Sequence, residues 1–234
     1  MDVSSGSDRT DIGWIEWFCD LDGHEFLIEI DEDYIVDNFN LYGLKPMIKH
    51  YDQALEMILS KEAPDSEDFN NAEYLTVYES AMDLYGLIHA RYITSPKGLA
   101  IMREKYLMGT FGNCPRVKCK RQYALPIGTS HKLNESRVKV FCPRCQEIYT
   151  PKYGSIDIDG AYFGPGFPFA LMQAFPELML DDGPEQFIPQ LYGFKIFGMR
   201  GSHYEYKYDN DGNFLNQKEV IEILNNKRTD AYDR

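Results

Sequence analysis

The sequence predicts an α+β protein: an α-helical N-terminal domain followed by a zinc-ribbon-like domain of short antiparallel β-strands, with a C-terminal docking segment and tail. Two observations predict this order. In the first hundred residues, apolar side chains recur every three to four positions, which is the period of a buried helix face. Four of the five cysteines then stand in two close pairs, Cys114 with Cys119 and Cys142 with Cys145, and 22 residues separate the pairs.

Three helices are predicted before the cysteines. The first covers residues 47–58, whose apolar side chains share one helical face and follow Pro46. The second covers residues 75–92 and carries an aromatic stripe that we assign to the core. Ser95 is placed to cap a third helix, which begins at Pro96 and continues to Tyr106. Shorter helical pieces are expected around residues 31–39.

The paired cysteines have the spacing of a structural zinc site with four thiolate ligands. A disulfide framework fits less well, because five cysteines are few and odd in number and residues 1–10 show no secretion signal. Four protein ligands fill the tetrahedral shell and leave no position for a reacting water, so the motif argues against an enzyme. Cys19 has no partner nearby in the sequence, and we interpret it as a buried thiol.

Strands are predicted in and after the cysteine region. Residues 137–142 alternate polar and apolar side chains as a half-buried strand does, and residues 146–149 can form its hairpin partner. Residues 186–197 are strongly apolar and β-prone. Two interpretations stand for that segment: an edge or hairpin that offers Tyr192 and Phe194 to another protein, or an ordinary core strand.

Charge is segregated along the chain, whose formal net charge is −13. Residues 1–100 hold 21 acidic and 6 basic residues, residues 101–152 hold 3 and 11, and residues 153–234 hold 13 and 7. Such blocks suggest a dipolar molecule that orients against charged partners, although two differently solvated surfaces would give the same counts. No apolar run reaches the roughly 18 residues of a membrane span. We therefore expect no membrane partner. The few cysteines and the lack of a secretion signal favour a reducing compartment, and we expect the protein in the cytoplasm and nucleus.

Three other motifs admit functional interpretations, but structural ones explain them better. The acidic residues 29–34 have no clustered His or Arg beside them and are expected to form the solvated start of a helix. His89 falls in the tyrosine-rich helix, where a hydrogen-bonded core histidine is expected. The glycines of residues 159–169 lack the spacing of a phosphate-binding or dinucleotide-binding loop, and we assign them to tight turns among packed aromatic rings.

Nine short motifs together point to one protein family. They are WIEWFC (14–19), DEDYI (31–35), FNLYGL (39–44), LYGLIHARY (84–92), CPRV (114–117), LPIG (125–128), YTPK (149–152), DGAYFG (159–164) and LYGFKI (191–196). With the two cysteine pairs, these motifs resemble those of the regulatory (beta) subunit of casein kinase II.

The resemblance implies a non-catalytic regulatory subunit of a Ser/Thr protein kinase. Its zinc ligands would be the residues Cys114, Cys119, Cys142 and Cys145, in a domain that carries a homodimer contact. The residues implied to dock the catalytic (alpha) subunits are Leu191, Tyr192, Gly193 and Phe194. The dimer would bind, stabilise and tether two catalytic subunits as a heterotetramer and modulate substrate selection. The acidic N-terminal domain would contact basic protein substrates or polyamines.

The resemblance and the charge pattern together imply five segments. These are a flexible acidic N-terminus (1–13), a helical acidic domain (14–108), a zinc-binding dimerisation domain (109–180), a docking segment for the catalytic subunit (181–198) and a variable C-terminal tail (199–234).

The chain departs from the family pattern in places. The acidic loop over residues 62–68 is diluted by Ala63, Pro64 and Ser66, which weakens the implied polyamine response. Ser5, with an aspartate three positions later, is the candidate phosphorylation site that remains in the N-terminus. The tail matches no pattern we know, and a short helix is expected over residues 217–225.

Two other classes of protein stay open at this stage. The basic residues 101–152 would suit a nucleic-acid-binding zinc ribbon, but the acidic flanking segments would repel phosphate. A zinc hydrolase would need a ligand position that four cysteines do not leave open.

Overall fold

The computed structural model describes residues 12–152, 156–180, 182–202, 204–222 and 225. The chain forms two compact units, Met1–Pro184 and Glu185–Arg234. Ser5 and all but the last two residues of the expected segment 1–13 lie outside the described residues. Within the described ranges, no helix is both long and apolar enough to cross a membrane.

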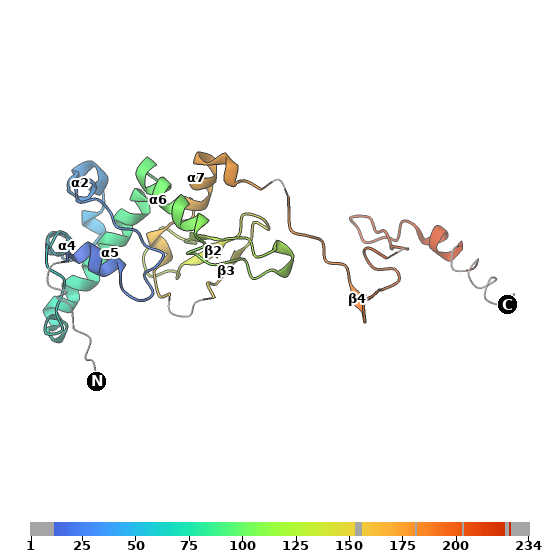
Figure 1. The fold of residues 1–234 in the computed structure, drawn as a ribbon, viewed down its shortest axis with the longest axis horizontal. Helices are drawn as coiled ribbons and strands as arrows, with labels where there is room; N and C mark the ends of the chain where they lie inside the picture. Colours follow the sequence, from blue (N-terminus) through green and yellow to red (C-terminus); the bar gives the residue numbers. More distant parts are fainter. Residues whose placement is uncertain (1–11, 153–155, 181, 203, 223–224, 226–234) are drawn as a thin grey trace, which may run out of the picture. The chain divides into compact units, whose positions relative to one another are not determined.

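Helices make up the N-terminal half of the first unit (Figure 1). They are α1 (Trp14–Cys19), α2 (Glu32–Val36), α3 (Asn38–Leu41), α4 (Tyr51–Ile58), α5 (Ala72–Tyr92) and α6 (Pro96–Leu107). The long helix α5 packs against α4 and buries Tyr85 and Tyr92 in the core, so the aromatic stripe is core as predicted. Ser95 caps α6 by accepting a hydrogen bond from the Gly98 N–H at 3.2 Å. The second and third predicted helices are therefore confirmed.

The first predicted helix begins later than expected. Pro46 lies in a separate 3₁₀ turn, Lys45–Met47, and the chain becomes extended at Ile48 and left-handed at His50, whose φ is 50°. A chain that passes through extended and left-handed residues cannot continue a ladder of helical hydrogen bonds. The helix α4 therefore starts at Tyr51. The short helical pieces predicted around residues 31–39 appear as α2 and α3.

A three-stranded antiparallel sheet follows the helices. β2 (Lys139–Phe141) lies between β1 (Leu125–Ile127) and β3 (Ile148–Tyr149). Val140 pairs with Tyr149 on one side and with Pro126 on the other. The predicted strand and its hairpin partner are confirmed. β1 was missed because a proline argues against a strand except at the edge of a sheet, and β1 is at the edge.

One hydrophobic core runs through the first unit, from α1 to the 3₁₀ turn Pro176–Leu178. The ring of Phe26 lies 5.3 Å from that of Phe111 and 6.5 Å from that of Phe163. The core thus crosses the position expected for a boundary between residues 108 and 109, and that boundary stays a prediction. The glycine-rich segment contributes buried rings, and a further helix, α7 (Phe167–Ala174), packs against β1 and α6.

The second unit begins with a hairpin. Its strands β4 (Gln190–Leu191) and β5 (Phe194–Lys195) pair antiparallel across a two-residue turn. Its aromatic side chains are exposed, which favours the hairpin interpretation of this segment over the core-strand one. Beyond the hairpin the chain stays folded, with isolated bridges between Gly198 and Glu205 and between Tyr208 and Phe214. Residues 217–222 are helical, within the range in which a short helix was predicted.

Candidate metal centre and docking hairpin

The first cysteine pair lies in a tight loop before β1. The Cys114 N–H donates to the Gln122 carbonyl at 2.8 Å, which closes the loop at its base. Just before the chain returns to this base, Lys120 and Arg121 adopt left-handed conformations, with φ of 52° and 57°. The Arg116 N–H points at the sulfur of Cys114, 3.4 Å away. The loop thereby turns both cysteine side chains to the same side.

The second pair forms the turn between β2 and β3. The Cys142 N–H donates to the Glu147 carbonyl at 3.0 Å, and the Gln146 N–H donates to the Cys142 carbonyl at 2.8 Å. Gln146 is left-handed, with a φ of 57°. Because β2 ends just before this turn and β3 begins just after it, the sheet fixes where Cys142 and Cys145 lie. We call the two loops, residues 114–119 and 142–145, the knuckles.

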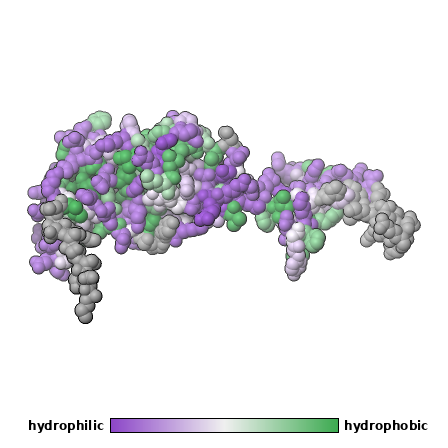
Figure 2. All heavy atoms as spheres, viewed as in Figure 1, coloured by the Kyte–Doolittle hydropathy of each residue, from purple (hydrophilic) through white to green (hydrophobic). Residues whose placement is uncertain are grey.

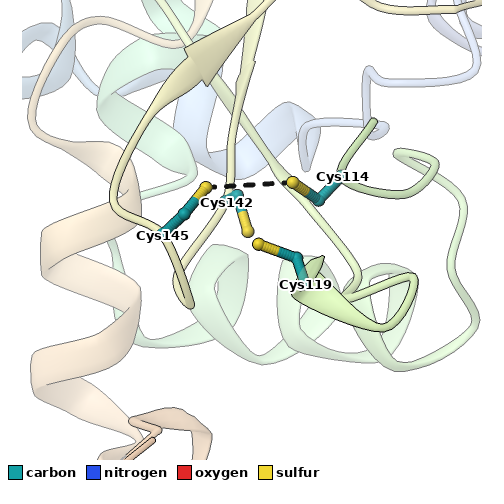
Figure 3. A group of neighbouring side chains, drawn as sticks. All are labelled: Cys114, Cys119, Cys142 and Cys145. Carbon is teal, nitrogen blue, oxygen red and sulfur yellow. Dashed lines mark hydrogen bonds between the residues drawn. The ribbon is translucent and has the colours of Figure 1, made fainter. Parts of the chain in front are cut away.

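The four predicted ligands come together. Their sulfur atoms all lie within 4.8 Å of one another, and those of Cys114 and Cys145 are 3.8 Å apart. Figure 3 shows the sulfur atoms converging from the two knuckles. A tetrahedral zinc ion with Zn–S bonds of about 2.3 Å would space its sulfurs about 3.8 Å apart. The cluster can hold a metal ion, and its geometry is compatible with zinc.

The thiols of the cluster do not ionise alike. Burial, followed by hydrogen bonds with Cys114 and Cys145, raises the pKa of Cys119 to about 11. Burial acts on Cys145 in the same direction, but hydrogen bonds, first from the Tyr149 hydroxyl and then from the backbone of Glu147, outweigh it and lower the pKa to about 7. A divalent cation would favour the thiolate form of all four.

Basic residues flank these cysteines in the sequence. They lie in or next to the knuckles and are Arg116, Lys118, Lys120, Arg121 and Arg144. Because zinc with four thiolates carries a formal charge of −2, neighbouring cations would stabilise the occupied centre. A bound metal would therefore give these five of the 11 basic residues in 101–152 a structural role that requires no nucleic acid.

The other candidate residues have structural roles. Asp31, in the acidic cluster, accepts hydrogen bonds from Lys97 and from the Tyr92 hydroxyl at 2.8 Å each, and the bond from Lys97 is the main reason that the pKa of Asp31 is lowered. The thiol of Cys19 is largely buried and lies 3.2 Å from the Tyr85 hydroxyl, and its burial raises its pKa to about 12. Neither residue faces the cysteine cluster.

His89 is fully buried and fully hydrogen-bonded. Its Nε2 accepts from the Ile28 N–H at 3.2 Å, so its Nδ1 carries the proton and donates to the Tyr162 carbonyl at 2.7 Å. Burial lowers its pKa to about 4. The histidine thus ties three segments of the core together, as a satisfied core histidine was expected to do.

Exposed apolar residues near the knuckles, which we call the apolar surface beside the knuckles, were not identified from the sequence. Val117, between the first two cysteines, is 88% exposed, and Met108 is 77% exposed. Tyr123 and Ile148 are also exposed. The signal that could have revealed it was Val117 itself, an apolar residue inside a tight loop of charged neighbours.

The predicted docking residues occupy the tip of the hairpin. Leu191 pairs with Phe194, and the turn between them is Tyr192-Gly193, with φ of 51° and 84°. Two successive positive φ values define a type I′ turn, which glycine and asparagine favour and a bulky aromatic residue does not. Tyr192 is 93% exposed and Phe194 79%. Figure 2 shows hydrophobic atoms at the surface around this hairpin.

Comparison with known proteins gives one consistent result. Residues 13–195 match the family model of the casein kinase II regulatory subunit. The chain is similar to casein kinase II subunit beta of Dictyostelium discoideum, 50% identical over 189 residues that cover 80% of this chain and 69% of the relative. The corresponding subunit of Schizosaccharomyces pombe is 48% identical over 184 residues, which are 78% of each chain. Subunit beta′ of Drosophila melanogaster is 44% identical over 191 residues, covering 81% of this chain and 86% of the relative.

Proposed function

Because the chain belongs to the family of casein kinase II regulatory subunits, we propose that it is a zinc-stabilised homodimer that binds and stabilises two catalytic (alpha) subunits. The dimer would tether them in a heterotetramer and modulate their choice of substrates. As a regulatory chain it is not itself an enzyme, and four ligands that close a metal shell agree with that. We place the complex in the cytoplasm and nucleus.

Zinc is the metal that the cluster suits best. Thiolates are soft ligands, and four of them in a tetrahedral arrangement are typical of a structural zinc site. Cys114, Cys119, Cys142 and Cys145 would hold the ion, and the ion would fasten the two knuckles to each other. Since it binds the folded chain, it would contribute to the free energy of folding.

A second copy of the chain is the proposed partner of the apolar surface beside the knuckles. Val117 lies in a knuckle whose backbone the metal would hold rigid, and Met108 caps the end of α6, so burial of these exposed side chains would cost little ordering. In a twofold dimer one such surface meets its own copy, which lets a single apolar patch serve both subunits. This surface supports the homodimer.

The exposed hairpin is the observation that carries the docking role. Leu191, Tyr192 and Phe194 present apolar side chains to solvent at the end of a narrow two-stranded projection. Aromatic residues that fill pockets on a partner dominate the binding energy of protein interfaces. Gly193 lets the turn close so that the aromatic side chains on both sides of it are presented together.

Two experiments test the docking role. A pull-down of the chain from its native extract, with mass analysis, is expected to recover a kinase catalytic chain in stoichiometric amount. In the purified system, Tyr192→Ala with Phe194→Ala is expected to weaken binding of the catalytic subunit at least about 100-fold, because two buried aromatic anchors are lost. The dimer and its zinc content should not change.

The matched control removes two aromatic side chains that are as exposed but lie in the first unit. Phe39 and Tyr42, on and beside α3, meet that description. Phe39→Ala with Tyr42→Ala should leave kinase binding intact. Unchanged binding by the hairpin variant would contradict the docking role.

We also propose that the acidic N-terminal domain contacts basic protein substrates or polyamines, and that Ser5 is phosphorylated. The excess of 21 acidic over 6 basic residues in residues 1–100 supports the first of these. Spermine binding that weakens steeply with salt would support it, and salt-independent binding would contradict it. Mass analysis after incubation of the holoenzyme with ATP tests Ser5.

A nucleic-acid-binding zinc ribbon is the second candidate, because residues 101–152 hold 11 basic residues against 3 acidic ones. It predicts binding of DNA or RNA at low salt with a steep salt dependence. Absence of such binding would remove it.

A further inference from the structure

The tail of the second unit holds the base of the docking hairpin on both strands. On the incoming strand, Ile188 packs against Gly201, whose φ is 76°. A Cβ on Gly201 would lie 2.9 Å from a methyl carbon of Ile188, so the contact needs a residue without a side chain. The tail therefore reaches back over the strand that leads into the hairpin.

The outgoing strand is held by backbone and by rings. The Gly198 N–H donates to the Tyr204 carbonyl at 3.0 Å, and the Gly198 carbonyl accepts from the Tyr206 N–H at 2.9 Å. The ring of Phe197 lies 5.9 Å from the rings of both tyrosines, Tyr204 and Tyr206. The strand that leaves the hairpin is thereby paired again within three residues of its end.

A second layer supports this contact from behind. The ring of Phe214 packs edge-on against that of Tyr206, with centroids 5.0 Å apart. The Asp209 carboxylate closes the intervening turn by accepting from the Asn213 N–H at 2.8 Å, and the Asn216 amide donates to the Glu205 carbonyl at 2.9 Å. This layer lies wholly beyond residue 195, where the family match ends.

The hairpin needs such support. It contains two residue pairs, and a two-stranded hairpin of that size is marginal in water by itself. It also holds Tyr192 in a left-handed conformation that a bulky side chain disfavours. Strained turns persist only where the surrounding structure fixes them.

We propose that the packed tail residues Gly201, Tyr204, Tyr206 and Phe214 form a buttress that holds the docking hairpin in its binding shape before the catalytic subunit arrives. The proposal rests on the docking role argued above and assigns a task to the tail. A hairpin that is already ordered loses less conformational freedom on binding, so its affinity is higher at the same contact area. The buttress residues act through the hairpin and are positioning residues.

The test removes the second layer in the full-length chain. Phe214→Ala is expected to weaken binding of the catalytic subunit roughly 10-fold, because the hairpin must then order as it binds. Phe214→Tyr keeps the ring and should bind as the parent does. Leu215→Ala is the matched control, since Leu215 is the next residue and its side chain is 64% exposed. Dimer mass and zinc content report on the first unit in every variant.

A covalent cross-link separates positioning from direct contact. Gln190 and Lys195 face each other across the hairpin, outside the docking set, at a spacing that a disulfide can span. Adding Gln190→Cys and Lys195→Cys to Phe214→Ala should restore the affinity when the disulfide is formed and lose it again on mild reduction. If the tail touched the kinase instead, the cross-link would restore nothing, and the buttress proposal would be overturned.

The other possible results also decide whether the buttress proposal stands. Parental affinity in Phe214→Ala overturns the proposal, and Gly201→Ala, which crowds Ile188, gives a second and independent reading should Phe214→Ala prove insoluble. Tyr192→Ala with Phe194→Ala runs beside these variants. If that pair loses binding while neither buttress variant weakens it, the buttress alone is wrong. If that pair binds normally, the docking role itself is wrong.

Discussion

The knuckles and the docking hairpin use the same local device in different surroundings. At or beside both turns a non-glycine residue takes a positive φ: Lys120, Arg121 and Gln146 directly after the knuckles, and Tyr192 in the hairpin. The knuckles carry four converging cysteines, three of them buried. In the hairpin the turn residue points outward and is almost wholly exposed.

The difference shows what compensates strain in each region. A metal bound by four thiolates would fix the knuckle backbone directly, because each ligand anchors its own turn. The hairpin tip has no such centre, and its shape depends on packing at its base. In the proposed function the knuckles would serve geometry and the hairpin recognition, so the two should respond to different perturbations.

Removal of a ligand should have the largest effect. Cys114→Ser is expected to lose zinc and to yield unfolded or monomeric protein, because zinc binding to such modules is worth on the order of 10 kcal/mol. Metal content and sedimentation are the measurements. Cys19→Ser is the matched control, since Cys19 is the one cysteine outside the cluster and should keep zinc and dimer. A soluble, stable dimer from Cys114→Ser would refute the structural role of the cluster. Removal of zinc from the parent protein by a chelator should destabilise the fold as Cys114→Ser does.

A charge on the knuckle surface should break the dimer and spare the metal. Val117→Glu would bury an unpaired carboxylate in the proposed interface of each copy, which at about 3–5 kcal/mol weakens dimerisation at least roughly a thousandfold. Sedimentation over a concentration series measures it, with zinc content as the check on folding. Val36→Glu, an exposed valine on α2, should leave the dimer unchanged. A dimer unaffected by Val117→Glu would place the contact elsewhere.

The comparison also explains which features could be predicted from the sequence. The four cysteines were predictable because one ion needs all four at a fixed spacing, so their positions alone identify the centre. The strand β2 and the helices α5 and α6 follow from periodicity and capping residues such as Ser95. The edge strand β1 was not predictable, since Pro126 argues locally against the pairing that the sheet imposes.

The hairpin was only half predictable. Its apolar, β-prone composition indicated a strand, but the turn at Tyr192 contradicts residue preference and appears only once both strands are paired. The ring contacts of the tail join residues from Phe197 to Phe214 that have no repeating pattern. The exposure of Val117 could not be predicted either, because it depends on how the whole loop of residues 114–119 is oriented in the fold.

Acid should weaken the core of the first unit through His89. The pKa of this residue is about 4 in the folded chain and 6.5 in the unfolded one, so the unfolded state binds the proton more readily. The contribution of neutral His89 to the free energy of unfolding is therefore fully present above about pH 6.5. It is lost as the pH drops toward 4, and the loss reaches about 3 kcal/mol at 1.36 kcal/mol per pKa unit.

Urea unfolding between pH 7 and pH 4 measures this loss. His89→Gln cannot take up the proton, so its stability should be lower at pH 7 but should fall less steeply with acid. Equal slopes for the two proteins would rule out His89 as the titrating group.

The smallest change in stability is expected from a substitution in the hairpin turn. It separates the effect of the turn's shape on binding from the effect of the tyrosine ring's own contacts. Tyr192→Asn replaces a disfavoured left-handed residue by one that type I′ turns prefer, so the hairpin should gain about 1 kcal/mol of local stability. The same substitution removes an aromatic anchor, so the catalytic subunit should bind much less tightly although the turn is better formed. Hydrogen exchange at the Phe194 amide measures the first effect, and a binding titration measures the second. Slower exchange with undiminished binding would mean that the tyrosine ring contributes nothing to recognition, and that shape alone makes the hairpin a docking element.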